Sequence, residues 1–139
     1  MGFSQWFQRR MNARTVDKIR RKGGKLMGMD VLILHTVGRR SGQQKETPVT
    51  WFDDGEKARL LVASGGGRSH PDWYLNLMAH PDRASSEMHD GSPVPVTPHQ
   101  LEGSDRERAW RLITDVQPRY GNYQDKSHRE YPVIRLTER

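Results

Sequence analysis

The stretch from Gly38 to Lys45 has the composition of a loop that binds an anion. It places three cations, Arg39, Arg40 and Lys45, within seven positions, and its two glycines leave backbone N–H groups accessible. Cationic side chains and exposed N–H groups bind phosphate and carboxylate oxygens through charge-assisted hydrogen bonds. Composition alone slightly favours a solvated hairpin loop, so the anion site needs support from elsewhere in the chain.

That support comes from a second glycine-rich segment, Gly65-Gly66-Gly67, which directly follows an apolar stretch ending at Ser64. Glycine permits positive φ and the close approach of backbone to a ligand. Two glycine-bearing loops at strand ends can clasp one flat, anionic ligand between them. The two segments together therefore favour a binding site.

Standard catalytic and metal-binding patterns are absent from the sequence. The six histidines form neither HExxH nor His-x-His, and the chain has no Gly-x-Ser-x-Gly, no Gly-x-Gly-x-x-Gly and no complete P-loop. Because there is no cysteine, disulfides, thiol chemistry and Cys-based zinc sites are excluded. We therefore predict no metal site.

The composition describes one small, basic domain. The chain has 139 residues and a formal net charge of +6, which favours anionic partners such as phosphate, carboxylate ligands, acidic lipid or nucleic acid. No apolar run approaches the roughly 20 residues of a membrane-spanning helix, and the N-terminus lacks a signal-peptide core. The sequence predicts a cytoplasmic protein.

Residues 1–24 differ from the rest of the chain and predict a basic amphipathic helix. Phe3, Phe7 and Met11 are spaced at i, i+4 and i+8, basic residues flank them, and Gly23-Gly24 ends the segment. Two interpretations remain open. The helix packs on the barrel or on a second subunit, or it rests on the anionic inner face of the plasma membrane as a peripheral anchor.

Residues 25–139 carry several short apolar segments that predict strands. The first three lie at 31–37, 47–52 and 59–64, and the last at 132–136. Because the turn Asp53-Asp54-Gly55 separates the second from the third, we expect these two to form a hairpin.

A further hairpin is predicted around Asp90-Gly91, with arms at 83–88 and 92–99. The prolines of its second arm confine that arm to a sheet edge or to an irregular ribbon, because proline donates no ladder hydrogen bond.

Two helices are predicted between the strands, and each begins at a capping box. Ser69 starts the first, which ends before Pro81, and Ser104 starts the second, which ends at Pro118. Residues 120–130 are expected to form a polar loop. The inward-facing positions of the helices are Trp73, Leu77, Met78, Ala109, Leu112, Ile113 and Val116. Antiparallel strands with inserted helices indicate a small β-barrel of the α+β class.

Several motifs occur together and in a fixed order between residues 25 and 139. They are LHTVGRRSG at 34–42, TPV at 47–49, VASGG at 62–66, HPDWYLNL at 70–77 with HP at 80–81, YGNYQ at 120–124 and REYPV at 129–133. In this combination the chain resembles the deazaflavin-dependent nitroreductase family of actinobacteria.

The resemblance implies a split β-barrel related to the FMN-dependent pyridoxine phosphate oxidases, with the deazaflavin coenzyme F420 as cofactor. The tail of this coenzyme carries a phosphate and several glutamates, which a basic loop suits. The implied tail contacts are Arg39, Arg40, Ser41, Gly42, Gln43 and Lys45. The implied contacts of the ring and ribityl chain are Pro48, Val62, Ala63, Ser64, Gly66 and Gly67, with Trp73 and Asn76 closing the site.

The implied activity is hydride transfer from reduced F420 to quinones, nitro compounds or α,β-unsaturated carbonyl compounds. Tyr120 and Tyr123 belong to the implied substrate pocket, and either of them or Ser64 would supply the proton. Lid packing is the alternative role for the tyrosines. The chain departs from its relatives at Gln117, where they have a tyrosine, and at Gly65, where they often have a lysine.

Two other functions stay open on sequence. One is an FMN-binding reductase on the same barrel, and the other is a basic module that binds nucleic acid, although the arginines do not follow one strand face. The sequence does not name the physiological acceptor, and it leaves open both a monomer and a homodimer.

Overall fold

The computed structural model describes residues 3–26, 28–64, 69–89 and 91–139, with side chains from Asn12 onward except that of Leu26. The predicted glycine contacts Gly66 and Gly67, and Asp90 of the predicted turn, lie outside the described residues. So do the side chains of the predicted apolar stripe on the first helix, Phe3, Trp6, Phe7 and Met11.

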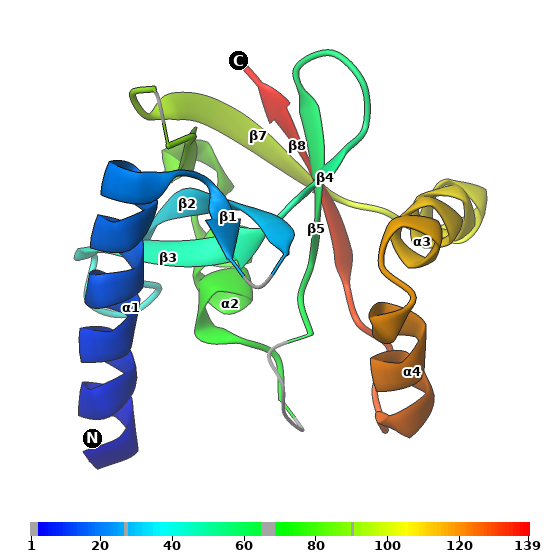
Figure 1. The fold of residues 1–139 in the computed structure, drawn as a ribbon, viewed down its shortest axis with the longest axis horizontal. Coiled ribbons are helices and arrows are strands. Elements are labelled where there is room, and N and C mark those ends of the chain that lie inside the picture. The colour runs from blue at the N-terminus through cyan, green and yellow to red at the C-terminus, as the bar shows by residue number, and fades with distance from the viewer. Residues whose placement is uncertain (1–2, 27, 65–68, 90) are drawn as a thin grey trace.

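The described strands form one eight-stranded antiparallel sheet that curls on itself (Figure 1). Its order is β1-β2-β6-β7-β8-β5-β4, and β3 pairs with β2. The strands are β1 (Lys25–Leu26), β2 (Met29–Val37), β3 (Gln44–Thr50), β4 (Phe52–Asp53), β5 (Ala58–Val62), β6 (Ser85–Glu87), β7 (Val94–Gln100) and β8 (Val133–Glu138).

Helices cover the sheet on several sides. In Figure 1, α1 lies against β2 and β3, α2 lies below the sheet, and α3 and α4 lie on the side away from α1. The helices are α1 (Phe3–Lys22), α2 (Asp72–Ala79), the single 3₁₀ turn η1 (Pro81–Arg83), α3 (Gly103–Val116) and α4 (Arg119–Lys126). The predicted α+β arrangement of antiparallel strands with inserted helices is confirmed.

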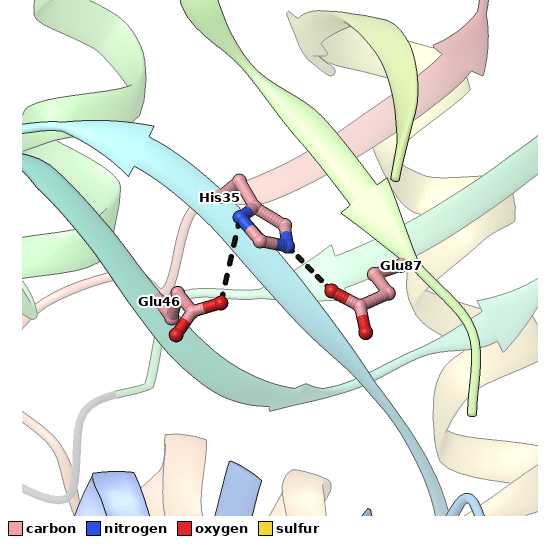
Figure 2. Close-up of side chains that lie close together, drawn as sticks. All are labelled: His35, Glu46 and Glu87. Atoms are coloured by element: carbon pink, nitrogen blue, oxygen red, sulfur yellow. Dashed lines mark hydrogen bonds and ion pairs between the residues drawn. The ribbon is translucent and has the colours of Figure 1, made fainter. Parts of the chain in front are cut away.

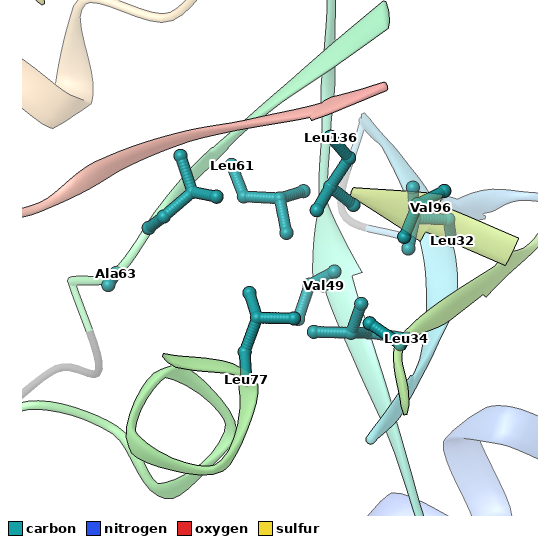
Figure 3. Packing of buried hydrophobic residues seen from close by; sticks show 10 residues of the cluster. Leu32, Leu34, Val49, Leu61, Ala63, Leu77, Val96 and Leu136 are labelled. Atoms are coloured by element: carbon teal, nitrogen blue, oxygen red, sulfur yellow. The ribbon is translucent and has the colours of Figure 1, made fainter. Parts of the chain in front are cut away.

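Strand alternation divides the core into clusters on opposite faces of the sheet. Because successive side chains of a strand point to opposite faces, Leu61 joins one cluster and its neighbour Leu60 another. The first cluster fills the space between the curled sheet and α2 (Figure 3). The second lies under α3 and α4, and the third under α1.

The predicted hairpin of 47–52 with 59–64 is wrong over most of its length. Residues 44–50 form β3, which pairs with β2 from Val31↔Thr50 to Val37↔Gln44. Only Phe52 and Asp53 pair with β5. The chain passes between the two pairings at Trp51, and the turn at 53–55 is therefore the end of a much shorter hairpin than predicted.

Both predicted capping boxes are wrong in detail. Pro71 is the residue that precedes α2, Glu102 precedes α3, and neither helix has a side-chain cap. Each helix is nevertheless present where its apolar spacing placed it, because Leu77 in α2 and Ile113 in α3 are fully buried. Burial of an amphipathic face contributes more than one cap does.

Two further expectations about the C-terminal third are corrected. Val116 is 62% exposed, so the buried face of α3 ends one turn earlier, at Ile113. The predicted polar loop at 120–130 is helical over Arg119–Lys126. Its buried residue, Tyr120, anchors this short helix in the second cluster.

The predicted edge position of the proline-rich arm holds for part of β7. The strand pairs with β6 only at Val94 and Pro95, and with β8 from Val96 to Gln100. Each residue of β7 therefore has a strand partner on one side only, β6 at its start and β8 from Val96 onward, so Pro98 lies where one side of the strand has no ladder partner.

The C-terminal half of α1 packs on the barrel. Val16 and Ile19 are buried against Val31 and Ile33 of β2 and form the third cluster with them. This end of the helix thus follows the packing interpretation of residues 1–24. None of the described helices is long and apolar enough to span a membrane.

Candidate functional site

The predicted anion loop is the tight connection between β2 and β3. Gly42 has φ of +72°, and its N–H donates to the carbonyl of Gly38 at 2.9 Å. A Cβ at Gly38 would lie 2.5 Å from Ser41 Oγ, so a side chain at this position would displace the Ser41 hydroxyl. The Ser41 hydroxyl also accepts a hydrogen bond from the Gln43 N–H at 3.2 Å. The glycines and Ser41 therefore set the shape of the loop.

Arg39 links this loop to α2. Its backbone N–H and its Nη1 both donate to Asn76 Oδ1, at 3.0 and 2.9 Å, and its Nη2 lies 3.3 Å from Asp72. Asn76 is buried, so its amide oxygen is committed to Arg39. The structure thus brings together two predicted cofactor contacts that are 37 positions apart in the chain.

The other two cations of the loop differ from Arg39. Arg40 is exposed and Lys45 is half-buried, with its side chain running past Gly38. Among the described side chains, none forms an ion pair with either residue. Cations without an acidic partner beside exposed loop backbone fit the phosphate and carboxylates of a coenzyme tail.

The end of β5 is held by an arginine from the C-terminal segment. Ala63 is buried and Ser64 is half-buried, and their carbonyl oxygens accept hydrogen bonds from Arg129, from Nη1 at 3.0 Å and from Nη2. Nη1 also lies 3.2 Å from Nδ1 of His70. The predicted ring contacts Val62, Ala63 and Ser64 therefore form a segment with a fixed backbone.

The two predicted tyrosines occupy different environments. Tyr120 is buried in the second cluster with Val62, and its ring packs edge-on against Phe52 at 5.7 Å. Tyr123 is 47% exposed and packs edge-on against Tyr120 at 5.8 Å. Burial raises the pKa of the Tyr120 hydroxyl, and a side-chain hydrogen bond with Thr50 opposes this rise. Tyr120 is a packed phenol, and Tyr123 is accessible from solvent.

The remaining predicted contacts lie on regular elements. Pro48 is half-buried on β3 opposite Ile33. Trp73 is half-buried on α2, where it packs against the first cluster and meets Tyr74 edge-on at 6.5 Å. Gln117 is the residue that follows α3, at the position where relatives are expected to have a tyrosine. Its side-chain oxygen accepts a hydrogen bond from Arg119 Nε at 3.0 Å.

A polar cluster of side chains from β2, β3 and β6 lies on the face of the sheet where α1 docks (Figure 2). His35 Nε2 is 2.8 Å from Glu87 Oε1, its Nδ1 is 3.8 Å from Glu46 Oε2, and the three side chains are close enough to bind a metal ion. Arg20 of α1, however, pairs with both carboxylates, with Glu87 at 2.7 Å. The Arg20 guanidinium therefore occupies the place that a metal ion would take between the two carboxylates, and these ion pairs attach α1 to the sheet.

Sequence reasoning missed three residues that organise the site: Arg129, His70 and Asp72. Each lies inside a motif that carries the family resemblance, but none is predicted from the sequence to contact the cofactor or the substrate. The only available signal was the charge of Arg129 in an otherwise aromatic and proline-rich segment. Its partners are 65 and 66 positions away, a distance over which spacing carries no information.

The chain is similar over most of its length to several known proteins. The chain is 30% identical to the F420H(2)-dependent quinone reductase of Mycobacterium tuberculosis (strain H37Rv), with all of both chains covered. A solved F420-H2 dependent reductase, FDR-A, is 34% identical, covers 76% of this chain and 92% of its own, and has a TM-score of 0.64. A structure described as a domain-swapped dimer is 27% identical over 97% of this chain and 99% of its own, with a TM-score of 0.65.

A more distant solved structure supports the fold alone. The pyridoxamine 5′-phosphate oxidase-like protein of Listeria innocua is 13% identical, covers 90% of this chain and 91% of its own, and has a TM-score of 0.53. The split β-barrel prediction is confirmed by these likenesses. The model of the F420H(2)-dependent quinone reductases matches residues 5–138, and the chain belongs to this oxidoreductase family, whose cofactor is coenzyme F420.

Proposed function

We propose that this protein transfers a hydride from reduced F420 to a quinone across a site formed by the Gly38–Lys45 loop, the end of β5 and α4. One observation carries the proposal: the loop and the end of β5 are both tied to α2. Arg39 of the loop binds Asn76 of α2, and Arg129, which holds the end of β5, contacts His70 just before that helix. Family membership supports F420-dependent quinone reduction. The residue roles below are our assignment, with residues 25–139 as the deazaflavin-binding body and α1 as an added helix.

The tail of the coenzyme would bind at the loop. Arg40 and Lys45 are the cations there that have no acidic partner among the described side chains, while Arg39 adds charge that Asp72 partly neutralises. Gly42, Ser41 and Gln43 contribute the turn whose backbone faces the tail. The arrangement suits several carboxylates and one phosphate, because each negative group finds a separate donor.

The ring and ribityl chain would lie along the end of β5. Val62, Ala63 and Ser64 would form its floor with their backbone, because the Val62 side chain joins the second cluster and that of Ala63 joins the first. Pro48, Trp73 and Asn76 lie on the neighbouring elements, and Gly66 and Gly67 remain predicted contacts. Pro48 and Trp73, both half-buried, would exclude water from the ring, while Ser64 offers a hydroxyl. Such a surface binds a flat ring and leaves one face open to a second reactant.

The chemistry requires a hydride donor and a proton donor. Reduced F420 supplies the hydride when bound, and a quinone becomes a hydroquinone by taking up that hydride and one proton. Tyr123 is the accessible phenol on α4 and is our first candidate for the proton, with Ser64 the second. Tyr120 supports Tyr123 by packing, because its own hydroxyl is buried and bonded to Thr50.

Quinones are the primary acceptors in this proposal, and nitro compounds and α,β-unsaturated carbonyl compounds are further ones. All three classes accept a hydride at an electron-poor centre and need a proton on oxygen. The Gln117 side chain, which stands where close relatives have a tyrosine, is held by Arg119 and removes one ring from the pocket. We therefore expect nitroimidazoles to be the weakest acceptors.

Two points on assembly also belong to the proposal. A homodimer is supported by the relative of 27% identity whose structure is described as a domain-swapped dimer. Peripheral attachment to the inner face of the plasma membrane would suit an enzyme whose acceptor is a lipid-soluble quinone, and the positive charge of the chain supports it.

The test is an anaerobic assay of the purified full chain with reduced F420 and, separately, with reduced FMN. Menadione, a nitroaromatic compound and cyclohexenone serve as acceptors, and oxidation of the coenzyme is followed by its absorbance. We expect F420 oxidation that depends on menadione, and little turnover with FMN. Tight binding of FMN together with inert reduced F420 would overturn the proposal.

A further inference from the structure

Arg129 lies between three segments of the proposed site. Its Nη1 donates to the carbonyl of Ala63 at 3.0 Å, its Nη2 donates to the carbonyl of Ser64, and Nη1 is 3.2 Å from His70 Nδ1. The guanidinium also lies over the ring of Tyr131 at 4.9 Å. One side chain therefore holds the end of β5 and the residue that leads into α2.

The segment that carries Arg129 is itself fastened to α4. Gln124 of α4 donates from Nε2 to the carbonyl of Arg129 at 2.8 Å, and its Oε1 accepts from the Tyr131 N–H at 2.8 Å. The Tyr131 hydroxyl donates to the carbonyl of Tyr123 at 3.1 Å. The network thus runs without a break from the helix of the two tyrosines to Ser64.

The two accepted carbonyls determine how the backbone at Ser64 is turned. In a trans peptide the C=O and the N–H point in opposite directions. Because the Ala63 carbonyl faces Arg129, the Ser64 N–H faces away from it, and among the described residues nothing accepts a hydrogen bond from that N–H. Only arginine offers a rigid fork of donors that holds two adjacent carbonyls at once.

The charge of Arg129 adds a second effect. No described carboxylate pairs with it, and its Nε is buried without a hydrogen-bond partner among the described residues. Its neighbour Glu130 instead pairs with Arg106 at 3.3 Å. A half-buried guanidinium without an acidic partner leaves net positive charge beside the end of β5, which favours an anionic ligand there.

We infer that Arg129 is a positioning residue for hydride transfer: it holds the Ala63–Ser64 peptide in the orientation that presents Ser64 to the ring, at a fixed place relative to α4. This inference rests on the proposed function. It concerns the alignment of the two reactants, since a small misplacement of a bound reactant costs up to about a hundredfold in rate.

The experiment compares Arg129→Ala and Arg129→Lys with a matched control, Arg106→Ala. Arg106 is also half-buried, donates to a backbone carbonyl, that of Tyr131 at 2.7 Å, and lies over an aromatic ring, Trp110, at 5.2 Å. Each variant is measured for its midpoint of thermal unfolding, its affinity for oxidised F420 and its kcat with menadione. Hydrogen exchange of peptides containing Ala63 and Ser64 is followed without coenzyme.

We expect Arg129→Ala to lose between about tenfold and a hundredfold in kcat. Its Ala63 N–H, which donates to the Pro132 carbonyl at 2.9 Å, should exchange faster than in the parent. Arg129→Lys, which keeps the charge but not the fork, recovers only part of the rate. Added methylguanidinium at millimolar concentration restores part of the rate of Arg129→Ala, and an equal concentration of sodium chloride does not. Arg106→Ala keeps its kcat even where its unfolding midpoint falls.

A kcat for Arg129→Ala within about twofold of the parent enzyme would overturn the inference. So would equal losses in Arg129→Ala and Arg106→Ala that follow the unfolding midpoint alone. A parent enzyme that does not oxidise reduced F420 would overturn the proposed function instead, and the exchange measurement would still report whether Arg129 holds the backbone.

Discussion

Adjacent residues of the same type have different environments in this site. Arg39 and Arg40 are neighbours in one basic loop, yet Arg39 is ordered by Asn76 and Asp72 while Arg40 is exposed. A guanidinium that is already paired gains less from a new anion than a free one does. Replacing Arg40 should therefore weaken tail binding without lowering the stability of the fold. Replacing Arg39 should weaken tail binding and also lower that stability.

Replacing Arg40 by alanine is predicted to weaken F420 binding by about 1.5 kcal/mol, roughly tenfold, because one charged hydrogen bond is lost. The midpoint of thermal unfolding should stay constant. Calorimetric titration checks the affinity, and the deficit should shrink for a coenzyme that lacks glutamates. The control is Arg111→Ala, which removes an exposed arginine on α3.

Arg39→Ala should lower both the affinity for F420 and the stability of the fold. Unchanged affinity in both loop variants would refute the tail site.

The two tyrosines are predicted to separate turnover from stability. Tyr123→Phe should lower kcat with quinones and leave the dissociation constant of F420 nearly unchanged, because the exposed hydroxyl is the proposed proton donor. Tyr120→Phe should cost about 1 kcal/mol of stability through the lost bond to Thr50. Stopped-flow rates and thermal unfolding of both variants test this. Parent rates in Tyr123→Phe would leave lid packing as its role.

At the scale of elements, local sequence patterns predict which segments form strands and helices, but not which strands pair with each other. The apolar spacing located β2, β5, α2 and α3, because each buries a face whose period is visible in the sequence. The predicted pairing of residues 47–52 is wrong because their ladder partner is determined by contacts distant in sequence. The capping boxes predicted at Ser69 and Ser104 are also wrong. One cap contributes less to the stability of a helix than the burial of its apolar face, so the helices form without it.

The candidate site could be predicted to a similar extent. The basic loop was visible from composition, and family resemblance pointed to Asn76, which the structure joins to Arg39. Arg129 could not be assigned a role, because its function lies in carbonyl contacts across 65 residues or more. The difference between Tyr120 and Tyr123 was also hidden, because it depends on a helix where the polar composition predicted a loop.

The docking of α1 is predicted to weaken in acid. Hydrogen bonds from Arg20 lower the pKa of Glu87 to about 2, from an ordinary value of 4.5. A carboxyl whose pKa is lower in the folded state contributes stability above its unfolded pKa, and that stability is lost as the pH falls from about 4.5 towards 2. With Arg20 partly exposed, the contribution is on the order of 2 kcal/mol.

Urea unfolding between pH 7 and pH 3 measures this effect, with the parent chain compared with Glu87→Gln. The parent should lose stability through the acid range, and the variant, which lacks the titrating carboxyl, should start lower and lose less. His35 and Glu46 are unchanged in both proteins. Parallel curves for the two proteins would show that Glu87 does not fasten α1.

On the scale of the whole molecule, the two parts of α1 have different roles: the C-terminal part packs on the barrel, and the N-terminal part is the proposed membrane contact. Val16, Ile19 and Arg20 attach its C-terminal half to β2 and to the Glu46–Glu87 pair. Removing the whole helix would therefore uncover Val31 and Ile33 and remove the arginine that pairs with Glu87. A test of membrane binding must keep this half intact and change only the basic residues that precede it.

The last prediction is reversible, salt-sensitive binding to anionic membranes through the part of α1 that precedes Val16. Each Lys or Arg near an anionic surface contributes about 1 kcal/mol. Arg9, Arg10 and Arg14, all changed to glutamine in the full chain, should thus weaken sedimentation with phosphatidylserine vesicles at low salt, while high salt releases the parent protein. Arg83, Arg111 and Lys126 changed together remove the same charge from other exposed positions and control for net charge. If both triple variants pellet like the parent, the helix is no membrane anchor, and its apolar stripe is then left to pack on protein.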